Sequence, residues 1–424
     1  MKIVVDLLWG YHVLGLILIT GIRLSISTGF FQIRRFFSWV KYSLAPPKSQ
    51  KSGGISRFGA LSAALAGSIG TGNIVGVAAA ITVGGPGAIF WMWISAVFGM
   101  MTVFAEVVLA YKYKNKKARG AFAYIEKIGK GKILPFIYGL GCVLSSLSMG
   151  NMAQSNAVAT GLSQFGVPMA ATGGVLCVIL FMLTKKGLKG VTKVTEKLVP
   201  FMALLFFGVS AICLIKFRHN IIPAFQEIMD SAFTLRAGAG GGLFLAMKTG
   251  ISRGVFTNEA GLGSSSMAFC EVEDASPVEL GYMGIFQVFV DTIVMCLVTA
   301  MCILCSTELR QGEYLVITAF QNGLGEWGKY IITVCMVLFA FATMTATCYY
   351  GKTGLDYISK GKLTFLFPYL FGACAFLGSI MNITGIFDFC DAFNGLMAIP
   401  NIIALAVFSG EIKGIIKAEK RLKS

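Results

Sequence analysis

Charged residues are scarce in this sequence, and their scarcity excludes a water-soluble globular protein. Asp, Glu, Lys and Arg make up 13% of the 424 residues, whereas hydrophobic residues make up 56%. A soluble chain carries about twice that share of charge to cover its surface. The sequence therefore predicts an integral membrane protein.

Histidine is scarcer still, which argues against a metal-dependent enzyme. His12 and His219 are the only two histidines, and neither has a metal ligand at helical spacing. The eleven cysteines fall almost entirely within apolar segments, where they are interpreted as small packing residues. No nucleophile with a base is found in these segments, so we expect a protein that is not an enzyme.

The apolar residues gather in helix-length runs of roughly 20 residues, enough to cross a bilayer. They lack the ten-residue alternation that is typical of membrane β-barrels. The predicted fold class is an all-α polytopic membrane protein with about 11 transmembrane helices. We expect these helices at residues 5–27, 58–82, 88–111, 134–164, 168–184, 196–216, 234–254, 279–305, 329–350, 363–381 and 385–409.

The positive charge is placed as in a membrane protein, not as in a nucleic-acid-binding protein. Lys and Arg collect in alternate loops, and the net charge of +16 comes from those loops. The positive-inside rule assigns such loops to the cytoplasm. We therefore expect a multi-pass protein of the plasma membrane with its N-terminus outside and its C-terminus in the cytoplasm, and no nucleic-acid partner. The first apolar run is interpreted as a span, not as a signal peptide.

Glycine interrupts two of the predicted helices. The segments are "GSIGTGNIVG" at 67–76 and "AGAGGGLF" at 237–244. With the first span set aside, they lie in the first and sixth of ten helices, so each opens a half of five. Because five is odd, the halves run in opposite directions, which is the arrangement of inverted-repeat transporters. The predicted parts are an N-terminal helix with linker (1–57), a first repeat (58–216) and a second repeat (217–424).

A helix broken inside the bilayer leaves backbone groups that need partners. The amides of Thr71, Gly72 and Asn73 begin the next half-helix, where the helix dipole favours an anion such as an amino-acid carboxylate. The carbonyls of Ala66 and Ile69 end the preceding half-helix and suit a hard cation such as sodium.

The alternative is that these glycines only let neighbouring helices approach closely. The second interruption, with Gly240 and Gly241, favours a ligand site over close packing, and these two glycines are predicted to line it from the other repeat.

Several segments resemble the alanine/glycine:cation symporter family, also called the sodium:alanine symporters. Members are similar in fold to the leucine transporter, with ten core helices in two inverted five-helix repeats, and one extra N-terminal helix here. The resemblance implies import of a small neutral amino acid with sodium. The matching segments are "GSIGTGNIVGVAAAITVGGPGAIFWMW" (67–93), "NMAQSNAVA" (151–159), "VTEKLVPFMA" (194–203), "RGVFTNEAGLGS" (253–264) and "VFVDTIVMCLVTA" (288–300).

The resemblance also implies roles for individual residues. Thr71, Gly72 and Asn73 would hold the substrate carboxylate, and Gln154 would reach the substrate from the facing helix. The sodium ion, transported and not catalytic, would be bound by the carbonyls of Ala66, Ile69 and Phe339 and the hydroxyl of Thr343.

Two positions depart from the family pattern. Ala342 replaces a serine, which removes one possible sodium ligand. Thr347 replaces a tryptophan, so we expect it to line a substrate pocket that is wider and more polar.

Acidic side chains within the predicted spans have two interpretations. Glu106, Asp291, Asp388 and Asp391 could relay protons or ions, or could make hydrogen bonds between helices. The segment with Arg253 and Glu259 could be an inner gate that opens through an ion pair and flexible backbone, or a solvated turn that caps a helix.

The sequence thus predicts a sodium-coupled symporter that works by alternating access. Its partners would be a small neutral amino acid, Na⁺ and the bilayer, with no obligatory protein partner. Two alternatives remain: a proton-coupled amino-acid transporter, in which Asp291 or Glu106 titrates, and a transporter-like sensor that binds amino acid without moving it.

Overall fold

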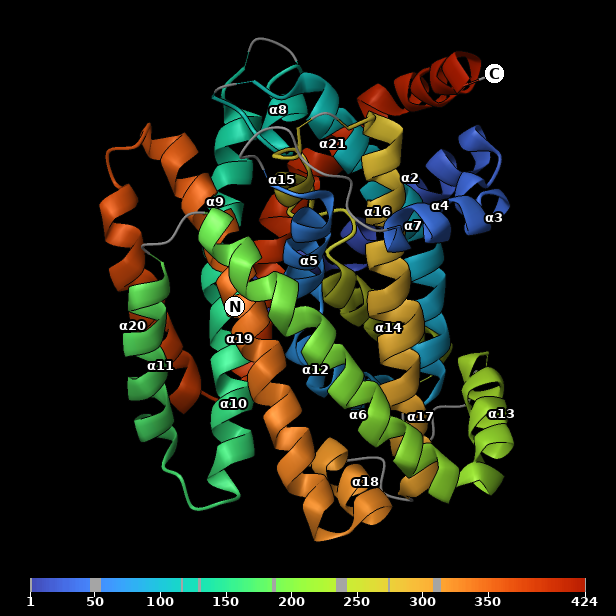
Figure 1. The fold of residues 1–424 in the computed structure, drawn as a ribbon, viewed down its shortest axis with the longest axis vertical. Helices are drawn as coiled ribbons and strands as arrows, with labels where there is room; N and C mark the ends of the chain where they lie inside the picture. The colour runs from blue at the N-terminus through green and yellow to red at the C-terminus, as the bar shows by residue number, and fades with distance from the viewer. Residues whose placement is uncertain are drawn as a thin grey trace.

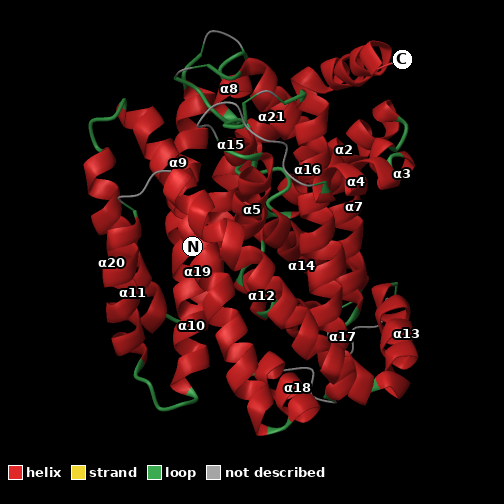
Figure 2. Ribbon diagram, viewed as in Figure 1, coloured by secondary structure: helices red, strands yellow, loops and turns green. Residues whose placement is uncertain are grey.

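The described residues of the computed structural model form helices joined by loops and turns (Figure 2). Within these ranges the only strand-like pairing is an isolated bridge between Ile55 and Val272. The expectation of an all-α protein is therefore confirmed. The described residues are 2–45, 55–115, 117–128, 131–184, 188–233, 242–273, 275–307 and 314–423.

The first half of the chain forms α-helices of varied length, a short 3-10 helix, η1, and a short π-helix, η2. Its elements are α1 (Lys2–Trp9), α2 (Tyr11–Thr28), α3 (Phe31–Arg34), α4 (Phe36–Leu44), α5 (Arg57–Ser68), η1 (Thr71–Asn73), α6 (Val75–Gly84), α7 (Gly87–Tyr113), α8 (Phe122–Ile125), α9 (Ile133–Leu147), η2 (Ser148–Met152), α10 (Ala153–Ser163), α11 (Met169–Leu183) and α12 (Leu188–Lys216).

The second half repeats this mixture of α-helices, 3-10 helices and a π-helix. Its elements are η3 (Arg218–Asn220), α13 (Ile221–Ala232), α14 (Leu243–Asn258), α15 (Ser266–Phe269), α16 (Pro277–Val288), η4 (Phe289–Cys296), α17 (Leu297–Ser306), α18 (Leu315–Leu324), α19 (Glu326–Ser359), η5 (Thr364–Leu366), α20 (Phe367–Ile380) and α21 (Ile383–Lys423).

Helix ends follow local sequence signals. The Ser56 hydroxyl caps α5 by accepting a hydrogen bond of 2.7 Å from the N–H of Gly59. Ser276 caps α16 in the same way, and Pro277 occupies the first helical position, where no N–H is required. Gly85, with φ of 72°, makes the left-handed turn between α6 and α7 that a residue with a side chain rarely adopts.

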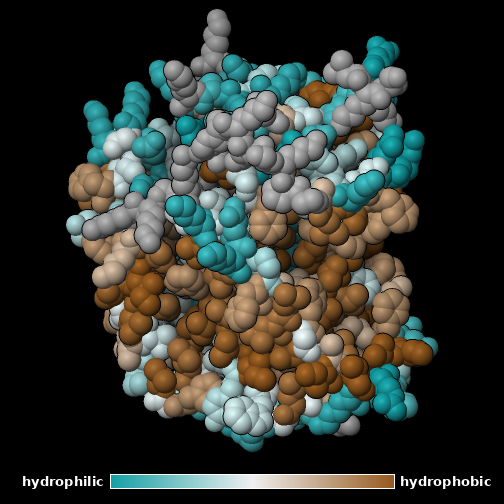
Figure 3. All heavy atoms as spheres, viewed as in Figure 1, coloured by the Kyte–Doolittle hydropathy of each residue, from teal (hydrophilic) through white to brown (hydrophobic). Residues whose placement is uncertain are grey.

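Seven helical stretches in the described ranges are long and apolar enough to cross a membrane. They are Ile3–Thr28, Gly87–Tyr113, Ile133–Ser163, Gly190–Lys216, Pro277–Ser306, Glu326–Ser359 and Ile383–Glu419. Apolar side chains form a broad band across one face of the molecule, and hydrophilic side chains gather beyond it (Figure 3). These features agree with a multi-pass membrane protein.

The remaining predicted spans fall on shorter helices: α5 with α6, α11, α14 and α20. Each of the eleven predicted segments therefore overlaps a helix. The number of membrane crossings stays a prediction.

The helices form a bundle whose two ends differ (Figure 1). The C-terminus lies at one end of the bundle, together with α8, α3 and α4. Helices α13 and α18 lie at the opposite end. Helix α7 packs against α14 and α16 in the interior, α9 packs against α19 and α21, and α11 pairs with α20 at one flank.

A second interruption lies further along the chain than the glycine run at 237–244, most of which falls outside the described residues. Helix α14 begins at Leu243 and continues to Asn258, and a non-helical segment at 259–265 separates it from α15. Gly261 and Gly263 in this segment have positive φ angles of 96° and 74°, so two glycines break the helix here. Gly240 and Gly241 lie outside the described residues.

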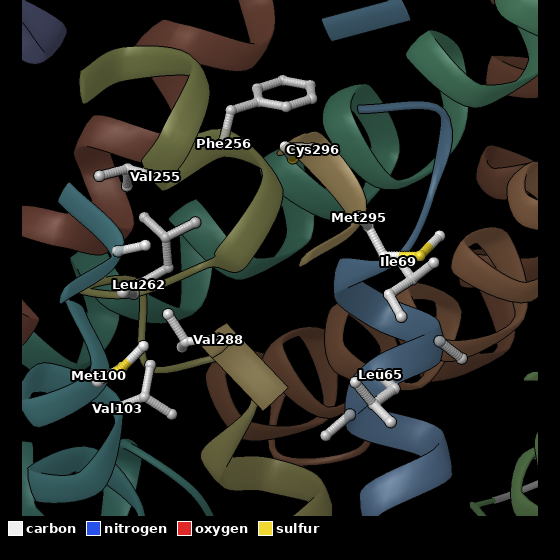
Figure 4. Close-up of a cluster of buried hydrophobic side chains, with 14 of the residues drawn as sticks. Leu65, Ile69, Met100, Val103, Val255, Phe256, Leu262, Val288, Met295 and Cys296 are labelled. Carbon is white, nitrogen blue, oxygen red and sulfur yellow. The ribbon is translucent and has the colours of Figure 1, made fainter. Parts of the chain in front are cut away.

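Apolar side chains fill the space between the two interruptions. Ile69, which follows α5, and Leu262, which follows α14, are both fully buried. Figure 4 shows both in one cluster with Val255 of α14, Val288 of α16 and Met295 of η4. The two interruptions are thus held by a common core.

Candidate functional site

The first interruption is the predicted break in the helix at 67–76. Helix α5 ends at Ser68, Gly70 is extended with φ of −134° and ψ of −159°, and α6 begins only at Val75. The N–H of Gly70 donates to Oδ1 of Asn73 (2.9 Å) and so does not continue the helix by bonding to the carbonyl of Ala66. Backbone groups at this point therefore have partners other than those of a regular helix.

Gln154 of α10 lies directly against this interruption. Its Oε1 accepts hydrogen bonds from the N–H (3.0 Å) and the hydroxyl (2.8 Å) of Thr71. Both side chains are buried, at 2% and 4% exposure. Two of the predicted substrate residues are therefore in contact, and a neutral amide oxygen sits where an anion was expected.

The predicted ion ligands also meet at the interruption. The Thr343 hydroxyl of α19 donates to the carbonyl of Ile69 at 3.2 Å. Phe339 lies one turn earlier on α19, Ala66 lies in the last turn of α5, and both are fully buried. The structure thus brings α19 to the carbonyl end of α5, and a role in binding sodium stays a proposal.

Thr347 is packed tightly, although a threonine in place of the family tryptophan was expected to leave a wider pocket. Its hydroxyl lies within hydrogen-bond distance of the carbonyls of Gly150 (3.0 Å) and Thr343 (2.8 Å). A Cβ added at Gly150 would clash with Thr347, so these helices are in close contact. The cavity that Thr347 lines is about 10 Å³. A widened pocket is not present in this conformation, because Thr347 packs directly against Gly150.

Asn73 pairs with the buried carboxylate of Asp291, a contact that the sequence did not predict. Its Nδ2 donates to Oδ1 (2.8 Å) and to the backbone carbonyl of Asp291 (2.9 Å). The Thr292 hydroxyl donates to Oδ2 at 2.7 Å. Asp291 lies in η4, a π-helical stretch of the kind that often marks functional sites. Asp291 therefore holds the first interruption from the second half of the chain.

Glu106 of α7 holds the second interruption. Its Oε1 accepts hydrogen bonds from the N–H groups of Gly261 (2.9 Å) and Gly263 (3.2 Å) and from Nδ2 of Asn401 (2.7 Å). This geometry favours the interpretation as a hydrogen bond between structural elements. Asn401 was missed in the sequence, although a lone amide within an apolar run is a usable signal.

Arg253 and Glu259 do not form an ion pair with each other in this structure, so the contacts do not favour the interpretation of their segment as an ion-paired gate. Arg253 lies within α14 and pairs with Asp391 of α21 at 2.5 Å. Its guanidinium also lies over the rings of Phe256 (5.1 Å) and Phe387 (4.7 Å). Because the helix runs on to Asn258, Arg253 is more than a turn away from Glu259, which instead accepts a hydrogen bond of 2.5 Å from the Ser264 hydroxyl.

A larger cavity of about 570 Å³ adjoins the first interruption. It begins at Val75, immediately beyond the interruption, and the Arg253–Asp391 pair contributes to its wall. Residues at the start of α18 and α21 complete it. A compartment that could admit a small solute thus reaches from the α18 end of the bundle to the broken helix.

The sequence model of the sodium:alanine symporter family matches residues 1–423. This chain belongs to the sodium:alanine symporter family. The sodium/alanine symporter AgcS of Methanococcus maripaludis is 37% identical over 98% of this chain and 95% of its own. The probable sodium/glutamine symporter GlnT of Bacillus subtilis is 33% identical over 99% of this chain and 90% of its own.

The symporter also shares its fold with a solved transporter. A manganese transporter of Eremococcus coleocola superposes with a TM-score of 0.54 at 13% identity, covering 83% of this chain and 76% of that one. At this identity the likeness concerns the fold alone. The family and these relatives are membrane transporters, not enzymes, and the family implies coupling to sodium.

Proposed function

We propose that this symporter imports a small neutral amino acid together with sodium, and that both bind at the interruption between α5 and α6. The observation that carries the proposal is the set of contacts at this break. Thr71 and Gln154 meet on its amide side, and Thr343 meets the carbonyl of Ile69 on the other.

The substrate carboxylate would bind the amides of Thr71, Gly72 and Asn73. In the present conformation Gln154 supplies an acceptor oxygen to Thr71. A carboxylate would replace that oxygen with a charged one, and charge-assisted hydrogen bonds of this kind are roughly twice as strong as neutral ones. Cargo binding would therefore require Gln154 to turn away from Thr71 toward the cargo.

Sodium would bind the carbonyls of Ala66, Ile69 and Phe339 with the hydroxyl of Thr343. The same short segment then presents carbonyls to the ion and amides to the cargo. Because the ion fixes this segment, each ligand raises the affinity for the other, and the linkage is reciprocal. Coupled transport follows from that linkage.

The cavity of about 570 Å³ would be the entry path. It lies toward the α18 end of the bundle. The basic loops lie at the opposite end, so the positive-inside rule predicts that the α18 end faces outside. The N-terminus would lie outside and the C-terminus in the cytoplasm. Rocking of the helices around the two interruptions would then close this path and open another toward the cytoplasm.

The eleven crossings and the two inverted repeats belong to this proposal. An interruption in the first core helix and a second at 259–265 in the sixth support repeats with the boundaries 58–216 and 217–424. Two breaks at corresponding places are expected of repeats that share one architecture.

The carried amino acid would be neutral, as are alanine and glutamine, after which two relatives are named. Thr347 and Gly150 are in contact, so a longer side chain would require these helices to separate. A thermal-shift screen of the twenty amino acids, with and without sodium, would rank the candidates. An absence of any response to alanine, glycine or glutamine would contradict the proposal.

Proton coupling is the second candidate, because Asp291 is a buried carboxylate in contact with the break. Uptake of labelled amino acid into proteoliposomes, with and without sodium at fixed pH, separates the two ions. Uptake that persists unchanged without sodium would overturn sodium coupling. Binding without any accumulation would instead indicate a sensor.

A further inference from the structure

Three buried oxygen atoms without hydrogen-bond partners face one small cavity. They are Oε1 of Glu259, Oγ of Ser146 and the hydroxyl oxygen of Tyr350, and these residues are at most 4% exposed. The cavity is about 10 Å³ and lies between α9, α19 and the segment at 259–265. Three separate parts of the chain thus contribute an unpartnered oxygen to the lining of one cavity.

Such an arrangement is costly unless something occupies it. A buried polar group without a partner costs about 1–3 kcal/mol, and an ionised carboxylate costs more. The other oxygen of Glu259 is bonded only to the Ser264 hydroxyl at 2.5 Å. Among the residues that the structure describes, Glu259 contacts no lysine or arginine. The carboxylate therefore needs either a cation or a proton.

The size of the cavity decides what kind of cation fits. About 10–15 Å³ of such space accommodates a single water-sized particle. The ammonium group of an amino acid, which carries its carbon skeleton with it, would not fit. A carboxylate with two hydroxyls is an oxygen-only ligand set, which hard metal ions prefer. We propose that this cavity is a second sodium site, in which Glu259, Ser146 and Tyr350 bind one dehydrated Na⁺.

This inference rests on the proposed function, because it takes sodium to be the coupling ion, and it adds a second ion to each transport cycle. The two ion sites share no residue. Tyr350 lies seven residues after Thr343 on α19, which corresponds to about 10 Å along a helix. The first ion would fix the break after α5, and the second would fix the break after α14. Both breaks would then respond to sodium.

The test measures Na⁺ binding without cargo. The melting temperature of the purified full-length protein is followed while NaCl replaces choline chloride at constant ionic strength. The background is Thr343→Ala, which weakens the other proposed ion site. Glu259→Gln keeps the shape of the side chain and removes its charge, and Tyr350→Phe and Ser146→Ala each remove one hydroxyl. Glu106→Gln is the matched control, because Glu106 is also buried at this segment but does not line the cavity.

We expect Glu259→Gln to raise the Na⁺ concentration for half-maximal stabilisation at least about tenfold, and the two hydroxyl variants to raise it severalfold. The Glu106→Gln variant should melt at a lower temperature than the parent, but Na⁺ should still raise its melting temperature with the same half-maximal concentration. If Glu259→Gln leaves the response unchanged, the group is protonated or bonded to water, and the second site is overturned. If it abolishes cargo binding but not the response to Na⁺, the cavity serves the cargo ammonium and the inference is also overturned.

Uptake assays keep this inference separate from the proposed function. If the parent protein imports amino acid with sodium while Glu259→Gln has the same sodium dependence, only the second site fails. If the parent shows no sodium-dependent uptake, the proposed function fails. A Na⁺ stabilisation that Glu259→Gln removes and Glu106→Gln keeps would still support the site.

Discussion

Gln154 and Thr71 are joined by two hydrogen bonds across the broken helix, because the amide oxygen of Gln154 accepts from both the N–H and the hydroxyl of Thr71. The N–H of Thr71 is one of the three amides that a substrate carboxylate is proposed to use. Gln154 thus stabilises the cargo-free state by satisfying donors that would otherwise be buried without partners. The same contacts make Gln154 a competitor of the cargo for Thr71.

Replacing Gln154 with leucine tests this competition. Gln154→Leu should lower the melting temperature without cargo, since each buried donor left unpaired costs about 1–3 kcal/mol. Saturating alanine at fixed sodium should then raise the melting temperature by more than in the parent, because its carboxylate restores the acceptor. A smaller alanine-induced shift would mean that Gln154 mainly binds the cargo. Ser155→Ala is the control, since the Ser155 hydroxyl donates to the backbone carbonyl of Asn151, four residues earlier in the chain.

The proposed ion site at Thr343 predicts a specific sodium phenotype. Thr343→Ala should raise the sodium concentration for half-maximal uptake by about tenfold, which corresponds to about 1.4 kcal/mol of binding free energy. Thr343→Ser keeps the hydroxyl and should retain affinity. Thr345→Ala removes a neighbouring hydroxyl that bonds to Phe341 of its own helix, and should leave sodium dependence unchanged. Equal effects of the two alanine variants would remove Thr343 from the ion site.

The first interruption could be predicted from sequence, whereas the break at 259–265 was not identified as a second interruption, for a physical reason. Glycine, threonine and asparagine within an apolar run are costly in lipid, so the break near Thr71 is visible locally. The second break depends on Gly261 and Gly263, which have positive φ angles. The N–H groups of both glycines donate hydrogen bonds to the carboxylate of Glu106. That carboxylate is more than 150 residues away in the sequence, and no local pattern reveals the pairing.

Partners across the bundle were hidden for the same reason. The sequence identified Asp291 and Asp391 as costly in a membrane but gave no partner for either. The structure supplies Asn73 and Arg253, each from a distant helix. Spacing along one helix cannot reveal such pairs, because they depend on how helices pack.

The close contact of Thr347 with Gly150 predicts that the family tryptophan cannot simply be restored. Thr347→Trp should lower the melting temperature strongly and reduce uptake of every amino acid, because the indole would have to enter a cavity of about 10 Å³. Thr347→Ser fits the same space and should keep both. A stable Thr347→Trp protein that still carries alanine but rejects glutamine would instead show that Thr347 borders a pocket that opens with the cargo.

The Arg253–Asp391 pair predicts a non-additive double substitution. Removing one partner of a buried ion pair leaves the other charge without compensation and costs about 3–5 kcal/mol. Arg253 and Asp391 side chains are only 10% and 13% exposed. Asp391→Asn and Arg253→Gln should therefore each lower the melting temperature strongly, and the double variant should melt above the lower of the two.

The exposed pair of Lys329 and Glu326 is the control, and breaking it with Glu326→Gln should leave the melting temperature unchanged within error. Additive losses at Arg253 and Asp391 would mean that the two charges do not stabilise each other, and that this wall of the entry cavity is held by the rings of Phe256 and Phe387 instead.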